Sequence, residues 1–124
     1  MANPNIVNVT AIYGTTTFLA PANTTANVLL SNAASSGLVY KINQIVCANV
    51  TGSAANTTVS IDNAAAGAGT DFPVVSAVSV PANASLIAVD KTTAIYLMEN
   101  QSITVTSGTS SAISYTISYE SIAS

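Results

Sequence analysis

Two kinds of side chain alternate along the last strand-like stretch of this chain. Between Ile113 and Glu120, Ile and Tyr at odd-numbered positions are separated by Ser, Thr or Glu at even-numbered positions. Because successive side chains of a β-strand point to opposite faces, this period places Ile113, Tyr115, Ile117 and Tyr119 on one buried face. The same alternation recurs with apolar positions at Val7, Val9, Ala11 and Tyr13, at Val59 and Ile61, and at Ile103 and Val105. The pattern predicts strands that each bury one face.

Two longer apolar runs, residues 38–50 and 93–98, are rich in Val, Ile, Thr and Tyr and predict central strands covered on both faces. Turn residues separate the runs, and one predicted turn lies at Tyr13-Gly14. The spacing of the turns is typical of an all-β sandwich. Candidate strands begin near residues 5, 15, 26, 38, 56, 74, 85, 94, 102 and 112. We expect about eight to form. Residues 1–124 therefore predict one all-β domain, a single antiparallel β-sandwich of the immunoglobulin-like or jelly-roll-like type.

Charged side chains are scarce: the chain has two Lys or Arg, five Asp or Glu and no His, while 49% of its residues are hydrophobic. A lone soluble domain has about a quarter charged residues, so we infer that neighbouring subunits cover part of the surface. Nucleic acid is not an expected partner, because phosphate binding requires clusters of Lys and Arg. Neither is a membrane, because no apolar run approaches the roughly 18 residues of a spanning helix. The start of the chain does not resemble a secretory signal, which predicts that the chain is not exported.

Residue types that usually do chemistry are few and scattered. Cys47 is expected to be a small buried hydrophobe, because no nearby base would activate its thiol. Without His, the Ser residues have no partner base. Asp62, Asn63 and Asp71 offer oxygen ligands of the kind that Ca²⁺ prefers, but turn-capping aspartates explain their positions at least as well. We expect no enzyme activity, no metal and no cofactor.

Two segments are suited to contacts with other subunits. Residues 1–12 are expected to form an extended arm that contacts a neighbour. Residues 63–69, NAAAGAG, predict either a flexible tip or a segment that packs closely against a neighbouring subunit. Sheet edges with few Lys residues to protect them invite pairing with another chain, so we expect a homo-oligomer, a trimer being one closed arrangement.

Four segments carry a shared pattern of strands and turns: YKINQIVCANVTG at residues 40–52, VPANASLIAVDK at 80–91, AIYLMENQSITVTS at 94–107 and ISYTISYESI at 113–122. As a set they resemble a group of small virion structural proteins of tailed bacteriophages, including phages of cyanobacteria. The N-terminal part has no match to that pattern. The turn at residues 99–102 departs from it, since members of the group tend to carry an acidic residue and Gly there.

The resemblance implies a non-enzymatic β-sandwich of the virion, which assembles in the host cytoplasm. Its expected role is that of a capsid decoration (cement) protein, which binds the major capsid protein or other virion proteins and stabilises the head by bridging capsid subunits. A neck, tail or fibre protein is the alternative, and a receptor- or glycan-binding module using Tyr13 or Tyr40, or a pilus or surface-layer subunit, stays open. The expected partner-contact residues are Pro4, Ile6, Val7, Val9, Ala33, Gly37, Asn63, Gly67, Gly69 and Asp71.

Overall fold

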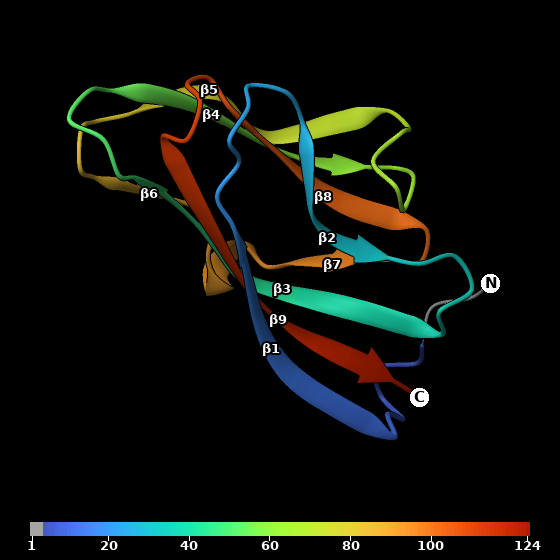
Figure 1. Ribbon diagram of the computed structural model, residues 1–124. Helices are drawn as coiled ribbons and strands as arrows, with labels where there is room; N and C mark the ends of the chain where they lie inside the picture. Colours follow the sequence, from blue (N-terminus) through green and yellow to red (C-terminus); the bar gives the residue numbers. More distant parts are fainter. Residues whose placement is uncertain (1–3) are drawn as a thin grey trace.

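The chain folds into two antiparallel sheets that pack face to face, as the computed structural model of residues 4–124 shows (Figure 1). The strands are β1 (Ala11–Leu19), β2 (Asn27–Asn32), β3 (Leu38–Asn49), β4 (Ala55–Asp62), β5 (Asp71–Val80), β6 (Ser85–Val89), β7 (Ile95–Leu97), β8 (Gln101–Ser107) and β9 (Ile113–Ala123). A short 3₁₀ helix, η1 (Lys91–Thr93), separates β6 from β7. The predicted all-β sandwich is confirmed.

The strand order identifies the type of sandwich. Sheet A has the order β1-β9-β3-β6, with β7 also paired to β3, and sheet B has the order β2-β8-β4-β5. The antiparallel pairs β1 with β9, β2 with β8, β3 with β6 and β7, and β4 with β5 are successive rungs of one long hairpin wound over both sheets. This is the jelly-roll order. Of the two sandwich types that the sequence allows, the jelly roll is the one formed.

The core lies between the sheets and is filled by the alternating apolar positions. Ile113, Tyr115 and Ile117 of β9 are at most 1% exposed, and Tyr119 packs at the margin of the core. Cys47 is fully buried, as predicted. Other fully buried members are Ile42, Ile45, Val59, Leu97, Ile103 and Val105. The period of two in the sequence thus assigns the buried face of β9 and β8 correctly.

The N-terminal part differs from the prediction. Residues 4–10 form turns and bends instead of a strand, and the expected turn at Tyr13-Gly14 does not form, because both residues lie within β1. The pairing with β9 explains the difference: Ala11 pairs with Ala123, the last residue of β9, so the residues before Ala11 have no partner strand. Ala11 and Ile12 of the expected arm thus belong to β1, and its residues 1–3 lie outside the described residues. The contact of the arm with a neighbouring subunit stays a prediction.

The apolar run at residues 93–98 was expected to be a central strand and instead forms the short edge strand β7, which pairs with β3. Leu97 is fully buried in the core, whereas Tyr96 and Met98 are about half exposed on the other side. The run is apolar on both sides because one side meets the core and the other meets the N-terminal segment. In contrast, β3 is central as predicted, with β9 on one side and β6 and β7 on the other.

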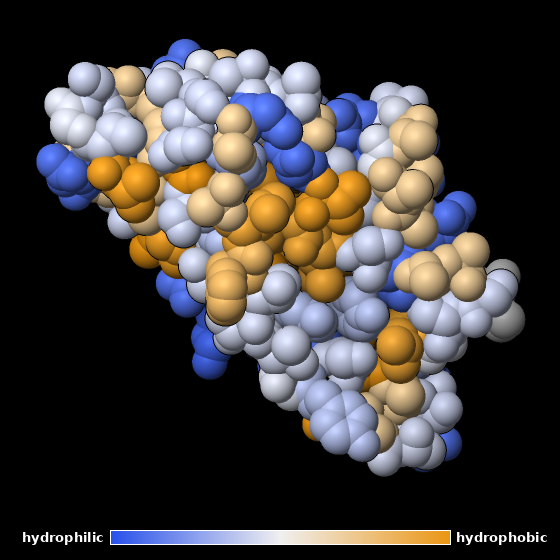
Figure 2. Space-filling view, in the orientation of Figure 1, coloured by the Kyte–Doolittle hydropathy of each residue, from blue (hydrophilic) through white to orange (hydrophobic). Residues whose placement is uncertain are grey.

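The sandwich is open along the side formed by the edge strands β1 and β2, which belong to different sheets and do not pair with each other. Figure 2 shows apolar atoms at the surface between them. Within residues 4–124, no helix has the length and hydropathy needed to cross a membrane.

Candidate interaction site at one end of the sandwich

Three connections and the N-terminal segment meet at one end of the sandwich, on the right in Figure 1. They are the β2–β3 turn (residues 33–37), the β4–β5 loop with the two strand residues that flank it (62–71), the β7–β8 turn with the end of β7 (96–100) and residues 4–10. We call this set of residues the loop end. Three of the four segments contain the residues that the sequence analysis assigns to partner contact.

The β7–β8 turn is the centre of the loop end, because each of its residues contacts a different segment. Met98 faces the N-terminal segment across an apolar hollow. A carboxylate oxygen of Glu99, Oε2, accepts a hydrogen bond from the backbone N–H of Gly37 at 2.9 Å. The side-chain oxygen of Asn100 accepts a hydrogen bond from the backbone N–H of Ala65 at 3.3 Å. The turn thus fixes the other segments relative to one another.

The apolar hollow has a volume of about 260 Å³ and is lined by Pro4, Ile6, Val39, Tyr96 and Met98. Pro4 and Ile6 are predicted contact residues, whereas the other three residues were not singled out. The hollow is open to solvent and almost wholly apolar, so it is suited to receive an apolar side chain from another protein. The apolar side chains on both sides of the run at residues 95–98 are the sequence signal that would have pointed to Tyr96 and Met98.

A buried asparagine fixes the β2–β3 turn. The side-chain nitrogen of Asn32, a fully buried residue, donates hydrogen bonds to the carbonyl oxygens of Leu38 at 2.9 Å and Leu97 at 3.2 Å. These bonds tie the turn to β3 and β7. Ala33 and Gly37, the predicted contact residues of this turn, are exposed.

The β4–β5 loop packs against its own sheet. The hydroxyl of Ser102 in β8 donates a hydrogen bond to the carbonyl oxygen of Ala64 at 2.8 Å. Gly67 lies so close to β2 that an added Cβ would be 2.8 Å from a methyl carbon of Val28. Residues 63–69 thus lie over the outer face of sheet B, a position that the sequence analysis did not foresee.

Asp62, a fully buried residue, organises this loop. Its Oδ1 atom accepts hydrogen bonds from the backbone N–H groups of Ala64 at 2.8 Å and Gly69 at 3.0 Å, whereas its buried Oδ2 atom has no hydrogen-bond partner. Asp71 lies opposite Asp62 in the sheet, and its Oδ1 atom accepts a hydrogen bond from the Thr104 hydroxyl at 2.9 Å. Among residues 4–124, no group of three or more His, Cys, Asp or Glu is placed to hold a metal ion.

The loop end brings together most of the predicted contact residues. Its exposed members include Ile6, Ala33, Gly37, Asn63, Gly69 and Asp71, and Pro4 and Gly67 are partly exposed. Val7 and Val9 belong to the segment that runs back along the C-terminal end of β9, where the Thr10 N–H donates to the Ala123 carbonyl. Val7 is 92% exposed.

The loop end is acidic. Asp62, Asp71 and Glu99 lie there, and Lys41 of β3 lies beside the hollow as the cross-strand neighbour of Tyr96. The Oε1 atom of Glu99 is buried without a hydrogen-bond partner, like the Oδ2 atom of Asp62. A partner that supplies apolar side chains together with Lys or Arg would complement this end.

Cys47 lies outside the loop end, in the core. Burial raises the pKa of its thiol from 9.0 to about 11, while a hydrogen bond with Thr57 acts in the opposite direction. The thiol is therefore neutral at physiological pH and is a poor nucleophile.

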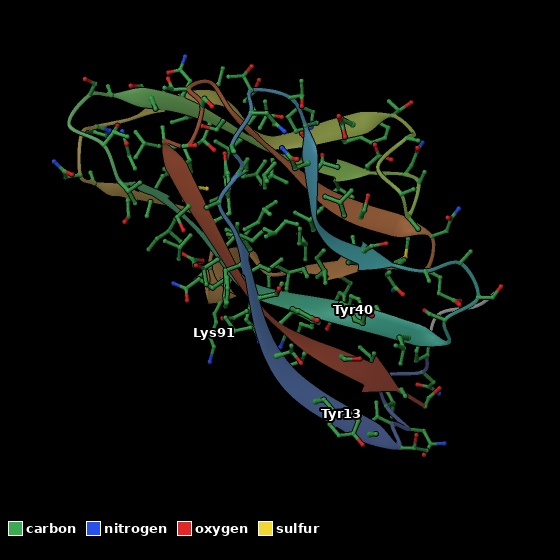
Figure 3. The ribbon with its side chains drawn as sticks, viewed as in Figure 1. Tyr13, Tyr40 and Lys91 are labelled. Carbon is green, nitrogen blue, oxygen red and sulfur yellow. The ribbon has the colours of Figure 1, made fainter. Side chains whose placement is uncertain are left out.

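Three tyrosines share the inner face of sheet A. Tyr13 and Tyr40 both pair with Ser121, and the rings of Tyr119 and Tyr40 pack at a tilt of 46° with 5.0 Å between their centroids. Figure 3 shows Tyr13 on β1 and Tyr40 on β3. Tyr13 is 68% exposed, whereas Tyr40 and Tyr119 are partly buried. This group is the second candidate surface.

Two comparisons of the sequence with known proteins found no match. No protein-family model matches the chain, and no curated protein is significantly similar to it in sequence.

Proposed function

We propose that this chain is a non-enzymatic structural protein of a tailed-bacteriophage virion, where it acts as a capsid decoration protein. In this proposal the loop end binds the major capsid protein of the assembled head. The observation that carries the proposal is the cluster of exposed apolar side chains that the fold gathers there. Ile6, Val7, Tyr96 and Met98 are between 42% and 92% exposed and lie on two segments that meet at the hollow.

The resemblance of the sequence to small virion proteins of tailed phages also supports this proposal. One of the resembling segments, residues 94–107, contains the β7–β8 turn at the centre of the loop end. The jelly-roll order is compatible with the proposal, since viral capsid proteins use this architecture, although one fold serves many functions.

Decoration would stabilise the head through many modest contacts. An apolar side chain of the capsid that enters the hollow loses its contact with water, which contributes about 25 cal/mol for each Å² of apolar area. Part of this gain is offset by the cost of association. Each bound copy that bridges two capsid subunits raises the free energy needed to separate them, and the effect repeats over the shell.

A role without catalysis agrees with the chemistry of the residues in the structure. The thiol of Cys47 is buried and has a raised pKa. The carboxylates of the loop end accept hydrogen bonds from the loops around them, so their first contribution is to shape those loops.

Head binding tests the proposal directly. Purified protein is added to phage heads from which it has been stripped, and binding is followed by sedimentation and by the melting temperature of the heads. Saturable binding with a higher melting temperature is expected.

Ile6→Asp and Met98→Asp should weaken binding, because each places a charge at the hollow. Val50→Asp is the matched control, because Val50 is 62% exposed but follows β3 at the opposite end. Loop-end variants that bind like the wild type would contradict the proposal.

The same experiment addresses a neck, tail or fibre position. Protein that fails to bind heads but sediments with purified tails would replace decoration by this alternative. Shortening residues 63–69 and deleting residues 1–10 should each reduce virion incorporation in either case, because both segments contribute to the loop end.

A second candidate function is glycan binding by the tyrosine group. Its supporting observation is that Tyr13, Tyr40 and Tyr119 lie on one face, and aromatic rings can form platforms for sugars. A glycan array probed with the wild type and with Tyr13→Ala tests it. Binding that is lost in Tyr13→Ala, together with unchanged binding to heads, would assign a receptor role to this face.

A further inference from the structure

The outer face of sheet A has a self-complementary arrangement of side chains. Residues paired across antiparallel strands lie on the same face, so the register of the strands defines rows that cross the sheet. Three successive rows on the face opposite the core carry the match: Gly14, Glu120, Lys41 and Tyr96; Thr16, Ser118 and Gln44; and Phe18, Thr116, Val46 and Ile87. The next row, of Ile12, Ile122 and Val39, adjoins the N-terminal segment at the hollow. Lys41 and Glu120 are the charged residues of these rows.

A two-fold axis that lies in the plane of this face would place a second copy of the sheet on the first, so that complementary residues of the two copies meet. The axis runs parallel to the strands, midway between β3 and β9. A second copy generated by this axis places its β3 over β9 of the first copy, and its β6 and β7 over β1. Each residue of a row then meets the residue at the mirrored position of the same row.

The charges match under this operation. Lys41 and Glu120 are direct cross-strand neighbours, so the axis places Lys41 of each copy over Glu120 of the other. Within one chain, a carboxylate oxygen of Glu120, Oε1, accepts a hydrogen bond from the side-chain nitrogen of Asn43 at 3.1 Å. The Asn43 bond orients the carboxylate on this face, where Lys41 of the same chain is its cross-strand neighbour.

The shapes match as well. Tyr96 is 46% exposed on β7, and the axis places it over Gly14, where nothing lies within 4 Å of an added Cβ. Phe18 and Ile87 are 76% and 54% exposed on the edge strands β1 and β6, and the axis brings Phe18 of each copy to Ile87 of the other. Two large exposed apolar side chains would thereby be covered.

We propose that a second copy of this chain packs against the outer face of sheet A in a two-fold symmetric dimer. Two sheets that pack face to face keep their strands nearly aligned, which this axis allows. Four strands of about nine residues give a footprint of roughly 19 Å by 30 Å. The accessible area of such a face exceeds its footprint, and a standard interface needs about 800 Å² from each partner. The dimer rests on other observations than the virion role of the loop end, and Tyr96, which also lines the hollow, is the residue that the two surfaces share.

Charge reversal and mixing test the dimer. Sedimentation velocity is measured on the wild type, Lys41→Glu, Glu120→Lys, and an equimolar mixture of the two variants. The wild type should be dimeric. Each single variant should dimerise at least about tenfold more weakly, because it places like charges together twice. The mixture should restore the dimer, because each contact between the two variants then joins Lys to Glu.

The mixture separates an intermolecular contact from a defect within one chain, because pairing of two chains cannot repair an unfolded variant. Lys91→Glu is the control, since Lys91 lies in η1 and outside the three rows. Phe18→Asp should weaken the dimer without change in melting temperature of the monomer, because Phe18 is exposed. A monomeric or trimeric wild type, or a mixture that stays as weakly associated as the single variants, would overturn the proposal.

Discussion

The hydroxyl oxygens of Thr57 and Tyr115 lie 2.6 Å apart, and their hydrogen bond joins sheet B to sheet A through the core. The Tyr115 hydroxyl also donates to the carbonyl oxygen of Thr106 at 2.9 Å. Thr57 therefore donates to Tyr115, and each hydroxyl proton has an acceptor. Both residues are at most 1% exposed, so no solvent replaces these bonds if they are lost.

Replacing Tyr115 by Phe should lower the free energy of unfolding by about 1–3 kcal/mol, because the buried Thr57 hydroxyl loses its acceptor. Urea denaturation measures the change. Tyr119→Phe is the control, since Tyr119 lies on the same strand at the margin of the core and should change far less. Adding Thr57→Val to Tyr115→Phe should recover part of the loss. Equal losses in the two Tyr variants would contradict this account.

The free energy of unfolding should fall at alkaline pH, because two groups in the core ionise there. Burial raises the pKa of Cys47 from 9.0 to about 11 and that of Tyr115 from 10.0 to about 12. A raised pKa means that folding favours the neutral form, so this contribution is complete below pH 9 and disappears as the pH rises through the folded values. In Cys47→Val, the midpoint of urea denaturation should fall less steeply between pH 9 and pH 11 than it does in the wild type. An unchanged slope in the variant would argue against it.

Gly69→Ala should destabilise the β4–β5 loop. A Cβ at this position would lie 2.0 Å from the side-chain oxygen of Asn63 and 2.8 Å from Oδ1 of Asp62, and Asp62 cannot move without losing its bonds to the loop. Overpacking of this kind costs about 1–3 kcal/mol. Gly52→Ala is the matched control, because nothing lies within 4 Å of its added Cβ. Thermal melts of the two variants should therefore differ, and identical melts would exclude a tightly packed loop.

Asp90 should titrate below its ordinary value of 3.8, first because the Thr92 hydroxyl donates to its side chain and then because the Thr92 N–H does so too. The resulting stabilisation is present above the ordinary pKa and is lost as the pH falls through the lower folded pKa. NMR titration of the carboxyl carbon measures the midpoint. Thr92→Val should move the pKa of Asp90 upward by removing the hydroxyl donor, and an unmoved midpoint would show that the cap contributes nothing.

The sequence alone predicts which residues are buried where one face of a strand meets the core. Ile113, Tyr115 and Ile117 alternate with polar residues, and this pattern alone places them correctly. It failed at Val7, which fits the same alternation, because a strand also needs a partner and β9 ends opposite Ala11. Periodicity describes which side of a strand is apolar, but it does not tell where the neighbouring strand stops.

The site was foreseen only in pieces. The N-terminal segment, the β2–β3 turn and the β4–β5 loop were expected to contact partners, yet nothing in their local patterns indicated that they meet. They meet through Met98, Glu99 and Asn100, whose contacts reach residues more than sixty positions away, such as Gly37. The self-complementary rows of sheet A were likewise hidden, since they depend on the register of five strands.

The pairing of β1 with β9 has a consequence for synthesis. Ala11 and Ala123 are direct partners, so the first strand made has no neighbour in its sheet until the last strand has left the ribosome. The order of translation therefore delays closure of sheet A to the end, when contacts of very long sequence separation must form, and such contacts form slowly. Until then the backbone N–H and C=O groups of β1 have no partner strand, and newly made chains in this condition are the ones most prone to aggregate or to need a chaperone.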